Sequence, residues 1–90
     1  MMTRVALITG ASSGIGAATV RALAAADTAV ALHARRNRAG AEAIASQLQG
    51  SGAKTLIVEG DLSEPGTAAR LVDETAARFG RLDIVVSNAG

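Results

Sequence analysis

The sequence contains no cysteine, tryptophan or tyrosine, and it has only one phenylalanine, one proline and one histidine. Without cysteine the chain can form no disulfide scaffold, thiol nucleophile or thiolate metal site. One histidine, His33, cannot build a histidine cage around a metal, so no metal site is expected. The charges are balanced, with nine Lys and Arg against eight Asp and Glu. That balance lacks the basic footprint of a nucleic-acid partner or of an anionic membrane surface.

Long apolar runs are also missing. No run approaches the ~20 residues that a membrane-spanning helix requires. The first apolar stretch, residues 5–8, is shorter than the ~7–15 residues of a signal-peptide core. These absences predict a cytoplasmic protein that has no membrane partner.

The chain of 90 residues is long enough for one domain at most. Apolar residues make up 49% of it and charged residues 19%, which excludes a disordered composition. Alanine supplies 21 of the apolar residues, and it buries little area per side chain. We therefore expect a core that is thin for an independent domain.

Short apolar runs alternate with segments of helical periodicity. The runs are continuous rather than alternating, which is typical of parallel strands covered on both faces. Strands are predicted at residues 5–9, 29–33, 55–58 and 82–86. Helices are predicted at residues 17–26 and 39–48, and a third is expected to have Ser63 as N-cap, Pro65 in its first turn and Phe79 near its end. This β-α-β-α-β-α-β order predicts the first part of a doubly wound, Rossmann-type α/β fold with parallel strand order 3-2-1-4.

A glycine-rich segment joins the first predicted strand to the first predicted helix. Its glycines follow the spacing G-x-x-x-G-x-G, and it ends where the helix begins. Glycines let the backbone turn sharply and approach a ligand, and a helix N-terminus attracts an anion. The alternative is an ordinary glycine-rich turn; a P-loop is excluded because no Lys-Ser/Thr pair follows the last glycine. The residues predicted to bind a pyrophosphate here are Gly10, Ser12, Ser13, Gly14, Ile15 and Gly16.

Two arginines follow the second strand, where a site for NAD usually has a carboxylate bound to the ribose hydroxyls. A carboxylate would repel a 2′-phosphate, whereas a guanidinium can bind one through two hydrogen bonds. Arg35 and Arg36 therefore favour NADP(H) over NAD(H). The alternative is that both merely begin a solvated helix. We interpret His33 beside them as a loop or packing residue rather than a catalyst.

Polar residues also follow the third and fourth strands. Asp61 could accept a hydrogen bond from an adenine amino group, with Leu62 beside the ring. Its alternative role is that of a helix cap. Asn88 is expected to bond the backbone of neighbouring strands, and Ala89 with Gly90 would leave room for a ribose.

Together these segments resemble the short-chain dehydrogenase/reductase family, over all 90 residues. Residues 9–16 match its cofactor motif T-G-x-x-x-G-I-G, and residues 61–62 match its acidic motif on the adenine side. Residues 87–90 match its N-N-A-G motif, except that Ser87 replaces the first asparagine. The resemblance implies that residues 10–16 hold the pyrophosphate and adenosine ribose, that Asp61 binds adenine, and that residues 88–90 support the sheet near the ribose. A basic residue where Arg35 stands resembles the members that prefer NADP(H).

The resemblance further implies an NADP(H)-dependent oxidoreductase that moves a hydride between nicotinamide and a carbonyl or alcohol carbon of a small molecule, and that works as a homo-oligomer. The family's catalytic serine and Tyr-x-x-x-Lys pair lie beyond the N-N-A-G motif. This sequence has no tyrosine and one lysine, Lys54, so no catalytic residue is assigned and the 90 residues alone are predicted to be inactive.

Two alternatives differ in class. One is a non-catalytic NADP(H)-binding module or remnant, which would need no Ser…Tyr-x-x-x-Lys continuation. The other is a methyltransferase that binds an adenosyl cofactor, which fits poorly because Arg35 and Arg36 stand where its acidic residue usually lies. The resemblance also implies that residues 1–90 are the N-terminal portion of a single, truncated NAD(P)-binding Rossmann domain. It places the fourth strand in mid-sheet, so the 90 residues alone should expose its edge and be unstable or self-associating.

Overall fold

The computed structural model describes residues 4–12 and 14–88 of the chain. All strand pairs are parallel, and the sheet order is β3-β2-β1-β4. The elements are β1 (Arg4–Ile8), α1 (Gly14–Ala25), β2 (Thr28–Ala34), α2 (Arg38–Gly50), β3 (Thr55–Glu59), α3 (Thr67–Phe79) and β4 (Ile84–Val86). The predicted Rossmann-type α/β fold with strand order 3-2-1-4 is therefore confirmed. Among the described residues, no helix has the length and apolar content that crossing a membrane requires.

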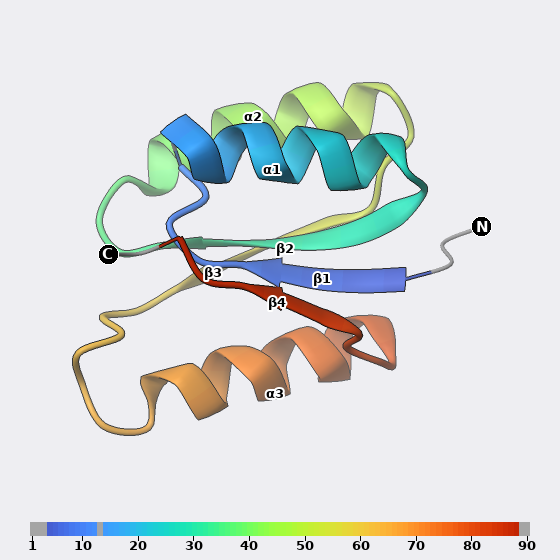
Figure 1. The fold of residues 1–90 in the computed structure, drawn as a ribbon. Coiled ribbons are helices and arrows are strands. Elements are labelled where there is room, and N and C mark those ends of the chain that lie inside the picture. Colours follow the sequence, from blue (N-terminus) through green and yellow to red (C-terminus); the bar gives the residue numbers. More distant parts are fainter. Residues whose placement is uncertain (1–3, 13, 89–90) are drawn as a thin grey trace.

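The helices lie on both faces of the sheet. Figure 1 shows α1 and α2 over one face and α3 over the other. Successive strand residues point to opposite faces, so each face contributes its own core. The core under α1 and α2 contains Ala6, Ile8, Val20, Val30, Leu32 and Ile44. The core over α3 contains Leu7, Ala31, Val58 and Leu71.

The central strands β1 and β2 are paired with their neighbours over more residues than the edge strand β4 is. Every residue of β2 is buried, and β2 pairs with β1 over five residues and with β3 over five. The strand β4 pairs with β1 over only three residues. The carboxyl ends of the four strands lie at one edge of the sheet, since the partners near those ends are Ile8, Leu32, Ile57 and Val86.

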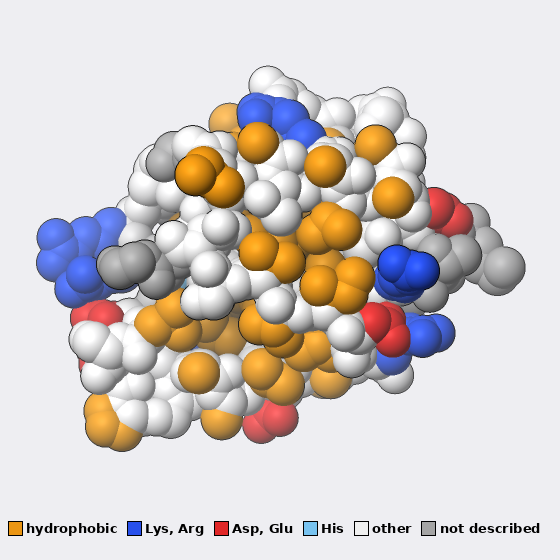
Figure 2. Space-filling view, viewed as in Figure 1, with side chains coloured by type: hydrophobic (Ala, Val, Ile, Leu, Met, Phe, Trp, Pro, Cys, Tyr) orange, Lys and Arg blue, Asp and Glu red, His pale blue; other side chains and the backbone are white. Residues whose placement is uncertain are grey.

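The strand β4 begins at Ile84, two residues later than predicted. Asp83 accounts for the late start, since its backbone N–H donates to Val5 O (2.9 Å) and its Oδ2 accepts from the Val5 N–H (2.8 Å). Beyond this pairing with β1 the edge of β4 is open within the described residues, and Val85 is 56% exposed. Figure 2 shows hydrophobic side chains gathering in the middle of this view, over β4.

The predicted start of the third helix was wrong. Helix α3 begins at Thr67, after Gly66 with a φ of 84°, and no side chain caps it. Pro65 therefore lies before the helix rather than in its first turn. Ser63 bonds back to Asp61 instead of capping α3. The local pattern Ser-x-Pro is compatible with a helix start, but the left-handed conformation of Gly66 interrupts the chain and delays the helix by about one turn.

Candidate functional site

The segments singled out in the sequence all follow the carboxyl end of a strand. They occupy the connections after β1, β2 and β3 and the residues after β4. Because the strands are parallel, these segments meet at one edge of the sheet (Figure 1). Here β1 and β4 are neighbours, and the chain has changed from the α1/α2 face to the α3 face. Ligands of doubly wound sheets bind at such a switch point.

Two glycines shape the connection from β1 to α1. A Cβ built on Gly16 would lie 2.0 Å from the carbonyl oxygen and 2.8 Å from the carbonyl carbon of Gly10, so only a residue without a side chain fits. Gly14 has a φ of 62°, and nothing lies within 4 Å of a Cβ built there. Gly16 therefore closes the turn tightly, while Gly14 leaves the space in front of α1 open.

The N-terminus of α1 faces this open space. The first turn of α1 holds no acidic residue, so no carboxylate of its own competes for its free N–H groups. Those groups and the helix dipole favour an anion. Ser12 is half-buried beside the turn, and Ile15 is 77% exposed. Ser13 lies outside the described residues.

One buried polar side chain joins two of these connections. His33, near the end of β2, is 1% exposed. Its Nδ1 accepts from the Gly10 N–H (3.1 Å), and its Nε2 lies 2.8 Å from the carbonyl oxygen of Gly60. Its own carbonyl accepts from the Ala11 N–H (2.9 Å). His33 was predicted to be a loop or packing residue, and its burial in β2 confirms packing rather than a loop. The bridge between the two connections was not predicted, although the imidazole that ends the apolar run of residues 29–32 was a signal for it.

Arg35 and Asp61 were predicted to contact different parts of a ligand, but they contact each other. Arg35 Nη2 lies 3.1 Å from Asp61 Oδ2. Asp61 Oδ1 also accepts from the backbone N–H and the hydroxyl of Ser63. These Ser63 hydrogen bonds, together with the Arg35 guanidinium, hold the pKa of Asp61 below its ordinary value. The alternative prediction, that Asp61 caps a helix, is wrong, because no side chain caps α3. The Asp61 carboxylate instead caps the turn at Ser63.

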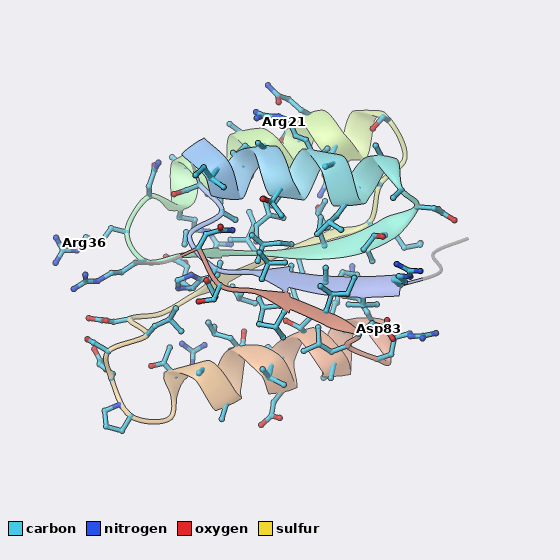
Figure 3. All side chains as sticks on the ribbon, viewed as in Figure 1. Arg21, Arg36 and Asp83 are labelled. Carbon is cyan, nitrogen blue, oxygen red and sulfur yellow. The ribbon has the colours of Figure 1, made fainter. Side chains whose placement is uncertain are left out.

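The two following arginines differ in their surroundings. Arg36 is exposed, and Figure 3 shows its side chain extending from the connection between β2 and α2 away from the sheet. No ion pair is formed by Arg36 within the described part of the chain. Arg38 instead pairs with Glu59 and Glu42. Among the described residues at this edge, Arg36 is therefore the arginine whose guanidinium forms no ion pair with a carboxylate.

Asn88 ties the end of β4 to the end of β1. Its N–H donates to Thr9 Oγ1 (3.0 Å), while the Thr9 N–H donates to Val86 O (2.9 Å). Asn88 Nδ2 is buried and has no hydrogen-bond partner among the described residues. This donor is available to a group beyond the described chain. Ala89 and Gly90, predicted to lie near it, fall outside the described residues.

We also searched the rest of the described residues for a metal site or a cavity. Residues 4–12 and 14–88 contain no group of three or more His, Cys, Asp or Glu side chains that could hold a metal ion. A shallow cavity lies at the opposite, amino-terminal ends of the strands, lined by residues that include Asp27, Gly52 and Lys54. It does not adjoin the connections described above, so the candidate site is the carboxyl edge.

A parallel sheet with a glycine-rich turn and a helix N-terminus at its switch point is the architecture of dinucleotide-binding α/β proteins. The chain matches the family model described as short chain dehydrogenase over residues 4–90. It therefore belongs to the short-chain dehydrogenase family. It spans about a third of the length of the curated relatives that it matches.

Three similar proteins illustrate the match. The chain is 45% identical over 87 residues to a cis-4-hydroxycyclohexanecarboxylate dehydrogenase of Sinomonas cyclohexanicum, covering 97% of this chain and 34% of that protein. It is 38% identical to the structure of a short-chain dehydrogenase/reductase from Serratia marcescens, with a TM-score of 0.93 over 99% of this chain and 36% of that one. It is 33% identical to a FolM alternative dihydrofolate reductase 1 from Brucella suis in complex with NADP, with a TM-score of 0.89 over 97% of this chain and 36% of that one.

Proposed function

We propose that this chain is the N-terminal, cofactor-binding part of an NADP(H)-dependent oxidoreductase that transfers a hydride between nicotinamide and a carbonyl or alcohol carbon of a small molecule. The observation that carries the proposal is the turn from Gly10 to Gly16, which opens onto the N-terminus of α1 at the switch point of the sheet. Membership of the short-chain dehydrogenase family supports it.

Three features of the edge fit a dinucleotide. The first turn of α1 has no acidic residue, the space beside Gly14 is open, and Asn88 Nδ2 is a buried donor without a partner among the described residues. Asp61 with Leu62 would bind adenine, and Asn88, Ala89 and Gly90 would support the ribose beside the sheet. The residues that would hold the pyrophosphate and the adenosine ribose are Gly10, Ser12, Ser13, Gly14, Ile15 and Gly16.

When bound, nicotinamide would supply the hydride for reduction of a carbonyl or accept it from an alcohol. The residues of this chain bind and orient the cofactor. They include no tyrosine, and the family resemblance assigns the proton donor for the carbonyl oxygen to a tyrosine assisted by serine and lysine beyond the N-N-A-G motif.

The preference for NADP(H) rests on Arg35 and Arg36. Neither position carries the carboxylate that would repel a 2′-phosphate. Arg36 is exposed and can take a phosphate directly, whereas Arg35 must exchange part of its contact with Asp61 for it. A structure of the Brucella suis relative holds NADP, which favours the same cofactor here.

The test is to measure dissociation constants for NADPH and NADH in the protein that carries this chain. Arg35→Ala and Arg36→Ala should each weaken NADPH binding by about 10- to 100-fold, the value of one charge-assisted contact, and leave NADH binding nearly unchanged. Arg21→Ala is the matched control, because Arg21 is exposed on α1 away from the site (Figure 3). An unchanged NADPH-to-NADH ratio in both site variants would refute the assignment.

A second candidate is a non-catalytic NADP(H)-binding module, since every site residue named above would serve binding rather than chemistry. Both candidates predict NADPH binding, so turnover separates them. Steady NADPH oxidation with a ketone or aldehyde by the protein that carries this chain supports the enzyme. Tight NADPH binding without oxidation across a panel of aliphatic, aromatic and sugar carbonyls supports the module.

A further inference from the structure

His33 lies between two connections that the proposed function assigns to different parts of one ligand. The glycine-rich turn would hold the pyrophosphate, and the connection after β3, which contains Asp61, would hold adenine. The buried ring of His33 bonds Gly10 of the first and Gly60 of the second. The two connections are also bonded to the backbone of β2, through Ala11 N–H to His33 O and Gly60 N–H to Ala34 O.

The partners of His33 fix its tautomer. The Gly10 N–H can only donate, so Nδ1 must be the acceptor and carry no proton. The carbonyl oxygen of Gly60 can only accept, so Nε2 must carry the proton and donate. A second proton on Nδ1 would place an N–H against the Gly10 N–H. That proton would remove one hydrogen bond and keep the other.

Charged residues flank Gly60, one of the two partners of His33. Asp61 follows Gly60 directly in the chain. The Arg70 guanidinium of α3 donates to the carbonyl oxygen of Glu59, the residue before Gly60.

The other elements around His33 add only cations that are already paired, or no charge. The connection after β2 brings Arg35, which pairs with Asp61, and α2 brings Arg38, which pairs with Glu59. Residues 5–20, which form most of β1, the turn and the first half of α1, contain no charged side chain. The Gly10 side of the ring therefore meets the backbone N–H and no charged side chain of that segment.

We propose that His33 is a positioning residue that holds the glycine-rich turn and the adenine-side connection in register through its hydrogen bonds to Gly10 and Gly60. The inference rests on the proposed function. Its consequence is that breaking either hydrogen bond weakens cofactor binding, although His33 itself is buried. His33 touches no reacting atom, so it acts through Gly10 and Gly60.

Three substitutions separate the two hydrogen bonds. In His33→Asn the new side-chain carbonyl oxygen would occupy the place of Nδ1, so this variant keeps an acceptor for Gly10 and loses the bond to Gly60. In His33→Gln the new side-chain amide nitrogen would reach the place of the ring Nε2, so this variant keeps the bond to Gly60 and loses the acceptor for Gly10. His33→Phe removes both bonds at similar volume. Val30→Ala is the control, since Val30 is fully buried in the middle of the same strand, three residues before His33.

The first readout is the NADPH dissociation constant of the protein that carries this chain. His33→Asn and His33→Gln should each bind NADPH about tenfold more weakly than the wild type, because each loses one hydrogen bond. His33→Phe should lose more than either, and Val30→Ala should leave NADPH binding nearly unchanged.

The second readout needs no cofactor. In ¹H–¹⁵N spectra, His33→Gln should shift the Gly10 amide, because it removes the acceptor for that N–H, and His33→Asn should shift the amides of residues 61–63 instead. His33→Phe should shift both sets, and Val30→Ala should shift neither. A wild type that binds neither NADPH nor NADH would refute the proposed function, while this ligand-free readout would still decide the role of His33. A Gly10 amide that does not shift in His33→Gln and His33→Phe, or His33 variants that bind NADPH as tightly as the wild type, would overturn the inference.

Discussion

Gly16→Ala tests whether the tight turn is required for the site. The added methyl group would lie 2.0 Å from the carbonyl oxygen and 2.8 Å from the carbonyl carbon of Gly10. Both are backbone atoms, so no side-chain rotation relieves the clash. Overpacking of this kind costs about 1–3 kcal/mol, and we expect the upper end because the turn and the start of α1 must separate.

Gly50→Ala is the matched control, because it adds the same methyl group to another helical glycine. Gly50 is the last residue of α2, and nothing lies within 4 Å of a Cβ built there. Alanine is favoured over glycine in a helix by about 0.5–1 kcal/mol, so this variant should be slightly more stable than the wild type. The same Gly→Ala change is therefore expected to lower the free energy of unfolding at Gly16 and to raise it slightly at Gly50.

The assay is urea denaturation of the protein that carries this chain, with NADPH affinity measured on the folded protein. Gly16→Ala should lower the free energy of unfolding by about 3 kcal/mol and weaken NADPH binding more than tenfold. Gly50→Ala should leave NADPH binding unchanged. If Gly16→Ala is as stable as the wild type and binds NADPH equally well, the proposed close approach of Gly16 to Gly10 is wrong.

Three further predictions concern charge, assembly and turnover. The Arg81 guanidinium, helped by the Val5 N–H, holds the pKa of Asp83 below its ordinary value of 3.8. The ionised Asp83 carboxylate therefore stabilises the fold fully above pH 3.8, and this stabilisation is lost as the pH falls through the lower pKa that Asp83 has in the folded protein. Asp83→Asn should therefore be less stable than the wild type at pH 7 and show a smaller further loss in urea midpoint below about pH 4. The isolated 90-residue chain should self-associate through the open edge of β4, and Val85→Lys should raise its monomer fraction in light scattering; a monomeric wild-type chain with a sharp unfolding transition would contradict this. The same isolated chain should show no NADPH oxidation with any carbonyl compound, and measurable turnover would sink that claim.

The order of strands and helices could be predicted from the sequence because its causes are local. Continuous apolar runs such as residues 29–32 need cover on both faces, and this need predicts parallel strands. The glycine spacing at residues 10–16 likewise predicts a turn before a helix N-terminus. Boundaries were less predictable, since the start of α3 depends on the conformation of Gly66 and the start of β4 on the pairing of Asp83 with Val5.

The pairings within the candidate site were decided by the tertiary structure alone. His33 meets Gly10 and Gly60 across 23 and 27 residues of sequence, and Arg35 meets Asp61 across 26. No local pattern contains such contacts, because they exist only once the parallel register has brought three strand ends to one edge. The sequence by itself thus determined which residues reach that edge, and the packing of β1, β2 and β3 decided which of them bond to one another.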